Sequence, residues 1–474
     1  MMKRFARSIL VCLLILSFST LTWAAQVTGE FGSELRIPTK GDDKFDNTVG
    51  SLLLNIDLQE EIGEYGNWKL GLDTRFYDNT LDQLGDYIFD INSATANTTD
   101  EIDSQLDFKL DEAYATFLSP FELNIDVTVG RQYITYGVGD GVSTLNLCTP
   151  NYALYLDDLA RNQSRALDGL RIKWYPGDYQ VDLFLQSRMT PTYLGSSLES
   201  VYQTMANGAI INSTKQGLKA EGLPDQMVAG LPVNVVRMDP EPIDYGKDGP
   251  GLMMKAVGNI YNFDLGLNYQ RGYVPTRLIT NYEPVPEIDG DTGMPKQITV
   301  YLNEKYLFMQ KIGLTVTGTV GDTSVWSELT YNIPKEDFFA PELADNNALP
   351  EEYRFSDEKY VTGLFGIDYF FKNGTYVNAQ YIYGFPWEYT KSMLNSYLTF
   401  DAYRFFLNDR IKAEAKCAYC LSDQGWFLSP EISYQLRDGL NLWGKANLLG
   451  GDDESFLNNF EDLSQIVVGV TKTF

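Results

Sequence analysis

Residues 440–448 read Leu-Asn-Leu-Trp-Gly-Lys-Ala-Asn-Leu, so apolar or small residues occupy every second position, with polar or amphipathic residues between them. Side chains of a β-strand point alternately to its two faces. Leu442 and Leu448 therefore share one face, whereas Lys445 and Asn447 share the other. One face suits hydrocarbon and the other suits water. The same alternation recurs in residues 123–130, 179–186 and 263–270. It predicts a protein built from many β-strands.

The links between these predicted strands separate a barrel from a soluble sandwich, since both can contain alternating strands. Tight polar turns occur at residues 64–67, 119–122, 176–178, 262, 321–322, 372–374, 408–409 and 437–439. Between them lie longer links, of which the longest are residues 78–105, 137–165, 190–248, 275–304 and 334–357. Short turns on one rim and long loops on the other are typical of a bacterial outer-membrane barrel.

The candidate strands can be counted along the chain. They are residues 26–37, 49–60, 67–77, 107–118, 122–135, 167–175, 179–188, 249–260, 263–274, 306–319, 323–333, 359–371, 375–386, 395–407, 410–421, 426–436, 440–450 and 463–474. These are about 18 strands, an even number, as a barrel with both termini in the periplasm requires. Sixteen strands stay open because 395–421 can be read differently. We predict an all-β fold, a closed antiparallel transmembrane β-barrel with short periplasmic turns and long extracellular loops.

The first 25 residues have the pattern of an export signal. Lys3, Arg4 and Arg7 form a basic start, and residues 9–16 form a short apolar run. Small residues follow at the spacing of a cleavage site. A membrane anchor is the weaker interpretation, because a spanning helix needs about 20 apolar residues. We expect a signal peptide at 1–25, export through the Sec pathway, and a single barrel over 26–474 in the cell outer membrane.

Composition restricts the chemistry. The chain contains 44% apolar and 14% aromatic residues, no His, and a net charge of −27. Without His there is no Ser/His or Cys/His nucleophile pair and no His metal site. The acidic clusters at 289–293 and 452–454 lack the full spacing of a calcium loop. We therefore predict no enzyme activity, no catalytic residue, no cofactor, no metal site and no nucleic-acid partner.

The cysteines of the mature chain do not suggest a redox site. Cys417 and Cys420 are separated by an odd number of positions, so a regular strand places them on opposite faces. A disulfide needs Cβ atoms about 3.5–4.5 Å apart, which this arrangement forbids unless the strand is bulged. Cys148 falls in a predicted loop and can be a free thiol.

The C-terminus carries a resemblance to a known family. Ile466, Val468 and Val470 alternate before the terminal Phe474, and here the sequence resembles the outer-membrane porins, whose last strand ends in an aromatic residue. The resemblance implies that Phe474 is recognised by the barrel-assembly machinery. Lys472 departs from the pattern, since an aromatic or aliphatic residue is typical there; its stem can lie along apolar surface while the amine reaches water.

A second resemblance covers about 45 residues. The segments 130–132, 136–141 and 167–171 look like a block of several poorly characterised bacterial barrel families, where a Gly-rich bend follows one strand and an Asp-Gly pair opens the next. It implies kinship with porin-like proteins. Strict alternation directs Arg131 towards lipid, so we expect a bulge that redirects it to the lumen or rim.

A barrel of 16–18 strands is too wide for side chains to fill and leaves an aqueous channel. The residues expected to line it are Arg75, Arg171, Lys173 and Arg188 against Asp73 and Asp182. The link at 190–248 has its own apolar residues and is the candidate constriction or plug. The alternative for this link is an external cap that binds a partner.

Two functions from different classes fit this sequence. The first is a porin, an outer-membrane channel for passive or weakly selective diffusion of small solutes or ions. The alternative is a barrel that serves as a sleeve or docking component of a multiprotein outer-membrane complex, such as an electron conduit. Expected partners are outer-membrane lipid, the barrel-assembly machinery and small solutes or ions. Whether the chain forms a homo-oligomer or binds a periplasmic protein is left open.

Overall fold

The computed structural model describes most of the predicted barrel. It describes residues 26–40, 49–78, 104–120, 123–147, 166–191, 207–238, 249–290, 294–335 and 358–474, apart from a few single positions and short gaps inside these ranges, together with residues 243, 245, 338–339 and 355–356. The predicted signal peptide at 1–25 and Cys148 lie outside the described residues.

Eighteen strands of the described residues form one closed antiparallel barrel. They are β1 (Gln26–Pro38), β2 (Val49–Glu61), β3 (Gly66–Asp78), β4 (Ser104–Leu118), β5 (Ile125–Gln132), β6 (Leu167–Trp174), β7 (Tyr179–Arg188), β9 (Gly251–Ile260), β10 (Phe263–Ile288), β11 (Pro295–Val320), β12 (Thr323–Pro334), β15 (Tyr360–Phe370), β16 (Thr375–Tyr383), β17 (Ser396–Phe406), β18 (Ile411–Cys420), β19 (Trp426–Arg437), β20 (Leu440–Gly450) and β21 (Gln465–Thr473). Consecutive barrel strands pair with one another, and β1 also pairs with β21. The predicted fold class and strand number are confirmed.

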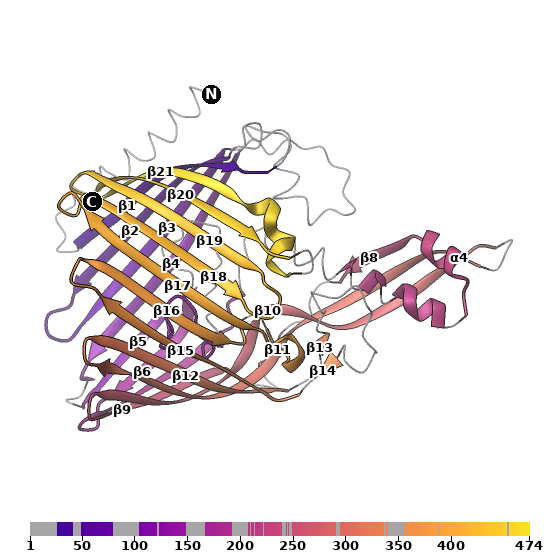
Figure 1. The fold of residues 1–474 in the computed structure, drawn as a ribbon. Helices are drawn as coiled ribbons and strands as arrows, with labels where there is room; N and C mark the ends of the chain where they lie inside the picture. The colour runs from indigo at the N-terminus through magenta and orange to yellow at the C-terminus, as the bar shows by residue number, and fades with distance from the viewer. Residues whose placement is uncertain are drawn as a thin grey trace.

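The two ends of the barrel differ, as the link lengths predict. The tight turns lie at the end where the chain terminates, and the long links leave from the opposite end (Figure 1). Gly439 shows why a turn needs glycine, because its φ is 69° and a Cβ there would lie 2.7 Å from the carbonyl oxygen of Thr473. We refer below to the turn end and the loop end.

The two faces of the barrel wall have opposite character. Outward positions such as Leu267, Leu314, Leu329 and Ile432 are large, apolar and exposed. Inward positions on the same sheet carry buried polar side chains, for example Asn268, Asn378 and Glu328. An apolar exterior around a polar interior is the arrangement that a lipid bilayer stabilises. Among the described residues, no helix is long and apolar enough to cross a membrane.

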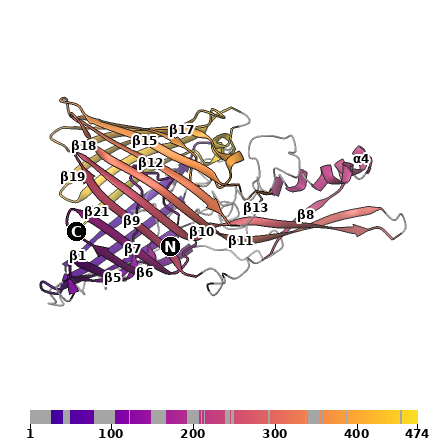
Figure 2. The ribbon, with the colours of Figure 1, turned by 90° about the horizontal axis from the view of Figure 1, so that it is seen from below.

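Strands β10 and β11 continue well beyond the barrel at the loop end (Figure 2). Pairing of β10 with β9 ends at Arg271, but its pairing with β11 continues to Ile288. Strand β8 (Val233–Arg237) adds parallel to β11, and the helix α4 (Asp225–Gly230) precedes it. We call residues 272–288, 295–308, β8 and α4 the arm. The link predicted at 275–304 is therefore a two-stranded extension.

The arm has a hydrophobic core of its own. Its buried residues are Ile210, Leu231, Ile279, Ile298, Val300 and Leu302. Residues 207–238 of the predicted long link at 190–248 thus supply helices and a strand to the arm. The described part of this link packs on the arm, beyond the barrel wall (Figure 2).

The remaining short elements lie at the loop end. Strands β13 (Phe338–Phe339) and β14 (Phe355–Ser356) pair with each other, and the 3-10 helices are η5 (Lys391–Met393) and η6 (Leu457–Leu463). Leu457 and Phe460 of η6 pack on Phe427 and Leu449 of the barrel wall. This part of the loop end is therefore fixed to β19 and β20.

Candidate pore and its inner segment

The chain turns into the barrel after β5. Residues 133–147, which we call the inner segment, contact the inward side chains of strands far away in the sequence. Tyr136 donates its hydroxyl to Oδ1 of Asp182 on β7, at 3.1 Å. The backbone N–H of Leu147 donates to Oε1 of Gln270 on β10, at 3.0 Å. The inner segment therefore lies along the inner wall from β7 towards β16.

A single carboxylate holds the middle of the inner segment. Oε1 of Glu328, on β12, accepts hydrogen bonds from the backbone N–H groups of Val138 and Gly139, at 2.5 and 2.9 Å. Its Oε2 accepts from the Ser143 hydroxyl at 2.9 Å and from the N–H of Thr144 at 3.0 Å. Hydrogen bonds to an ionised acceptor are about twice as strong as neutral ones. Glu328 is thus the principal anchor of the inner segment.

Two lysines bind the carbonyl groups on either side of this anchor. Nζ of Lys255, on β9, donates to the carbonyl oxygen of Tyr136 at 2.8 Å. Nζ of Lys311, on β11, donates to the carbonyl oxygen of Thr144 at 3.0 Å. Backbone groups buried away from water cost free energy unless they are paired. The inward lysines therefore donate hydrogen bonds to carbonyl groups that have no partner strand in this irregular stretch of backbone.

The tip of the inner segment binds β16. The backbone N–H of Asp140 donates to Oε1 of Gln380 at 2.9 Å, and Nδ2 of Asn378 donates to Oδ2 of Asp140 at 2.6 Å. Burial raises the pKa of the Asp140 carboxyl, while the nearby ammonium group of Lys416 acts to lower it and Asp368 to raise it. The contacts of the inner segment therefore extend from β7 to β16 along the wall.

Glycine is required where the inner segment folds back on itself. A Cβ on Gly137 would lie 1.8 Å from Oγ of Ser143 and 2.6 Å from Oε1 of Glu328. Gly141 has φ of 71°, a left-handed conformation that other residues adopt at a cost. The Gly-rich block noted in the sequence therefore shapes a hairpin-like bend around the carboxylate.

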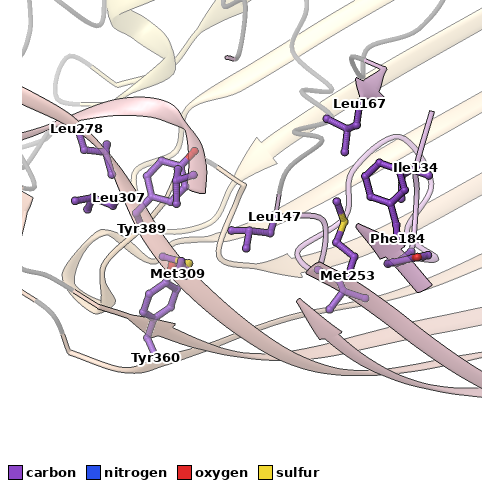
Figure 3. Close-up of a cluster of buried hydrophobic side chains, with 13 residues drawn as sticks. Ile134, Leu147, Leu167, Phe184, Met253, Leu278, Leu307, Met309, Tyr360 and Tyr389 are labelled. Carbon is purple, nitrogen blue, oxygen red and sulfur yellow. The ribbon is translucent and has the colours of Figure 1, made fainter. Parts of the chain in front are cut away.

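Apolar side chains of the inner segment pack between this segment and the barrel wall. Ile134 and Leu147 belong to a buried cluster with Phe184 of β7 and Met253 of β9 (Figure 3). The same cluster includes Leu307, where β11 leaves the barrel. The inner segment thus has an apolar side against the wall and polar contacts that fix its path. The inner segment therefore occupies part of the barrel interior along this side of the wall.

Three of the expected pore-lining residues, Arg171, Lys173 and Asp182, lie together on the inward face of β6 and β7. Arg171 on β6 donates from Nη2 to Oδ2 of Asp182 at 2.6 Å and from Nε to Oδ1 at 3.0 Å. Lys173 lies on the same face of β6 and opposes Asp182 in register. Arg171 and Asp182 form a bidentate pair, whose charges largely cancel.

Asp73 and Arg75 lie on β3, three strands from β6. Asp73 opposes Asn55 of β2 in register on the inward face. Arg75 lies in the strand two residues further on, and its side chain is outside the described part of the chain. The residues that the sequence predicts as one set of pore-lining charges therefore lie in separate parts of the barrel wall.

Arg188 lies on the other face of the wall from Asp182. Strand β7 contains an extra residue at Ser187, since Gly169 opposes Gln186 whereas Asp168 opposes Arg188. This bulge reverses the alternation that assigns Arg188 to the lumen. Its side chain is 72% exposed and lies 3.7 Å from Asp168.

The bulge expected at Arg131 occurs in its neighbour instead. Gly71 opposes Glu112 and Leu72 opposes Leu110, so Asp111 of β4 is the extra residue. Arg131 keeps the outward alternation and donates to both carboxylate oxygens of Asp168, from Nε at 2.8 Å and from Nη2 at 2.7 Å. It stands next to the end of β5, where the chain turns inward.

The wall opposite the inner segment carries paired charges. Nζ of Lys69 on β3 lies 2.5 Å from Oε2 of Glu112 and 3.9 Å from Asp57. Nζ of Lys412 on β18 lies 2.8 Å from Oε2 of Glu414. Both signs therefore face the bore, and mixed charged walls tune ion preference without blocking passage.

The terminal Phe474 closes the barrel seam. Its N–H donates to the carbonyl of Gly29 at 3.0 Å, and Gly29 donates back at 2.9 Å. Cys417 and Cys420 are free thiols, as the strand parity predicts. Glu328 is not among the residues that the sequence singles out, since no local signal connects it with a segment about 190 residues away.

No protein-family model matches the sequence, and no curated protein matches it. Among solved structures, OmpF of Salmonella typhi, in a complex with daunomycin, aligns with 95% of this chain and 97% of its own, at 10% identity and a TM-score of 0.39. A mutant of the Rh. blastica porin aligns over 95% and 100%, at 11% identity and a TM-score of 0.39. Similarity at this level carries no information about what passes through the bore.

The architecture rests on the strands themselves. A closed antiparallel wall of eighteen described strands has an apolar exterior, a polar interior, tight turns at one end and long excursions at the other. These are the properties of barrels that span a bacterial outer membrane. In its fold, the chain is a porin-like outer-membrane β-barrel.

Proposed function

We propose that this protein is an outer-membrane channel through which small hydrophilic solutes or ions diffuse, and that it catalyses no reaction. The observation that carries the proposal is the inner segment, held against one side of the bore by the carboxylate of Glu328. A barrel of this strand number is wide enough for water, so a segment folded inside it determines the passable cross-section. Mixed charges on the wall favour weak ion preference.

The sleeve alternative is not favoured by this arrangement. A partner threaded through the barrel would need the space that residues 133–147 occupy, and it would have to break their hydrogen bonds to Glu328 and Gln380. Hydrogen bonds to charged groups contribute about 1.5–3 kcal/mol each. Displacing the whole segment would therefore be costly.

Planar bilayers test the proposal directly. Purified protein alone is expected to give stepwise conductance. Glu328→Ala should raise the single-channel conductance and its noise, because the buried donors of the inner segment lose their acceptor at about 1–3 kcal/mol each. Glu431→Ala is the matched control, since Glu431 is an inward carboxylate on β19 that opposes Glu414 and Lys445 instead of the inner segment.

The results separate the alternatives. Conductance steps that increase with Glu328→Ala and keep their size with Glu431→Ala support a channel narrowed by the inner segment. Absence of steps in repeated reconstitutions of folded protein would contradict the proposal. Equal steps in wild type and Glu328→Ala would contradict the role given to the inner segment.

A further inference from the structure

Charged side chains gather on the outer face of the barrel at the loop end. Arg131 on β5, Asp168 on β6 and Arg188 on β7 are consecutive partners in the sheet register. The outward neighbours closer to the turn end are apolar, for example Val129, which is 49% exposed. A charge that faces lipid is expensive at the bilayer midplane and inexpensive near the interface. This group therefore marks the level at which the apolar band ends.

The two arginines share one carboxylate. Arg131 binds both oxygens of Asp168 as a fork, at 2.8 and 2.7 Å. Arg188 approaches Oδ2 of Asp168 only to 3.7 Å, and its side chain is 72% exposed. The guanidinium of Arg188 thus has donors directed away from Asp168.

A third arginine belongs to the same row. Arg271 on β10 opposes Leu252 on β9, which in turn opposes Leu185 on β7, so Arg271 is also outward. A Cβ on Gly249 would lie 3.5 Å from Nη2 of Arg271, so the guanidinium extends towards the level of Arg188. The Nε atom of Arg271 is buried and has no hydrogen-bond partner among the described residues.

Other cations lie on the surface at both ends of the barrel. Arg404 on β17 and Lys472 on β21 lie beside the tight turns, whereas the exposed Lys335, which follows β12 at the loop end, lies over the ring of Phe308. In a barrel with periplasmic turns, the loop end faces the outer leaflet. Arg131 and Arg188 share Asp168, and the carboxylate of Asp111 on β4 also lies near Arg131. Arg271 adds a third guanidinium on the outer face two strands beyond β7, so arginines outnumber carboxylates in this row although the whole chain carries −27.

We propose that Arg131, Arg188 and Arg271 bind phosphate groups of an anionic lipid headgroup in the outer leaflet. A guanidinium presents paired donors that match phosphate oxygens, and such charge-assisted hydrogen bonds are strong. Basic pockets at this depth of a membrane protein bind lipid headgroups. Arg188 and Arg271 supply the donors, and Asp168 holds Arg131 in place between the strands. The inference requires the barrel to span the membrane but does not require solutes to pass through it.

Binding of lipid A by the purified full chain in detergent tests the site. The probes are lipid A with both phosphates, the same lipid after chemical dephosphorylation, and inorganic phosphate as a competitor. The double variant Arg188→Gln with Arg271→Gln is expected to weaken binding of phosphorylated lipid A by about tenfold or more, the change that one lost charged hydrogen bond produces. Arg404→Gln, an outward arginine at the turn end, should bind as wild type does.

Each result decides the inference. Weaker binding by the double variant, with little binding of dephosphorylated lipid, supports a headgroup site. Equal binding of both lipids, or equal affinity of variant and wild type, overturns it. Competition by inorganic phosphate at millimolar concentration would assign the site to a soluble anion and overturn the lipid source. Should the double variant not fold, Arg188→Gln alone serves, because its side chain makes one long contact.

Conductance separates this inference from the proposed function. The double variant should keep the wild-type step size, since both arginines face away from the bore. A barrel that binds lipid A and gives no steps would refute only the channel. A barrel that conducts and ignores phosphate would refute only the lipid site.

Discussion

The inner segment and the arm leave the same end of the barrel in opposite directions and are held in different ways. The inner segment binds the barrel wall, through hydrogen bonds to Glu328, Gln270 and Gln380 and through an apolar cluster on one side. The arm has no wall to bind and forms a core of its own around Val300 and Leu302. A polar interior can therefore hold an irregular chain, whereas an excursion into water needs paired strands and buried apolar side chains.

Shortening each region should give the largest contrast. Replacing residues 137–146 by a short flexible link is expected to raise the single-channel conductance, on the order of twofold, because the bore loses its constriction. Replacing residues 277–306 by a tight turn should leave the conductance unchanged, since this part lies beyond the barrel wall. The comparison is broken if removal of the arm opens the pore and removal of the inner segment does not.

A single core substitution should unfold the arm alone. Leu302→Ala removes a side chain that is 0% exposed and should cost about 2–5 kcal/mol. Limited proteolysis is expected to cut within 207–238 and 272–308 of the variant, while the barrel keeps its heat-resistant electrophoretic form. Tyr301→Ala, on the opposite face of β11 and 38% exposed, is the control and should resist cleavage as wild type does.

Two glycines of the inner segment should respond differently to substitution by alanine, because Gly137 is crowded by neighbouring atoms and Gly141 is not. Gly137→Ala forces Ser143 and Glu328 apart and should cost about 1–3 kcal/mol. Gly141→Ala meets no atom within 4 Å, so only its φ of 71° matters, at about 1–2 kcal/mol. Current noise in bilayers should therefore be greater for Gly137→Ala, and the reverse order would count against the described bend.

Lowering the pH should stabilise the tip of the inner segment, and this is the smallest of the expected effects. Burial raises the pKa of Asp140 above its unfolded value, so the folded chain binds the proton more tightly. Its contribution is complete below the unfolded pKa of about 3.8 and is lost as the pH rises through the folded value. Current noise should fall as the pH is lowered from neutral, and Asp140→Asn should reduce that dependence. A variant with the full wild-type dependence would show that other carboxylates control it.

The sequence predicts the barrel well because a strand that separates lipid from water must alternate apolar and polar residues along its length. All eighteen predicted strands occur, and errors in their ends are mostly small. The larger error is the link at 275–304, where Pro284 and Pro286 argue against a strand. In the structure they lie on β10 beyond its pairing with β9, where this strand pairs with β11 alone and tolerates missing donors.

The site is harder to predict because it depends on partners that periodicity does not connect. Parity assigns Glu328 and Asp182 to the lumen, but only the fold shows that both meet residues 133–147. A single inserted residue, Ser187, is sufficient to move Arg188 to the outside. Bulges change the face of every residue that follows them, and alternation alone does not locate them.

The seam between β1 and β21 constrains how the molecule can be made. It joins the first and the last barrel strand, and beside it the side chain of Thr39 bonds to the carbonyl of Ser464, 425 positions later. Bringing such distant stretches together is slow, because the entropy of the intervening loop is lost first. The cylinder therefore stays open until β21 is in place, and a chain that lacks this strand keeps two unsatisfied edges.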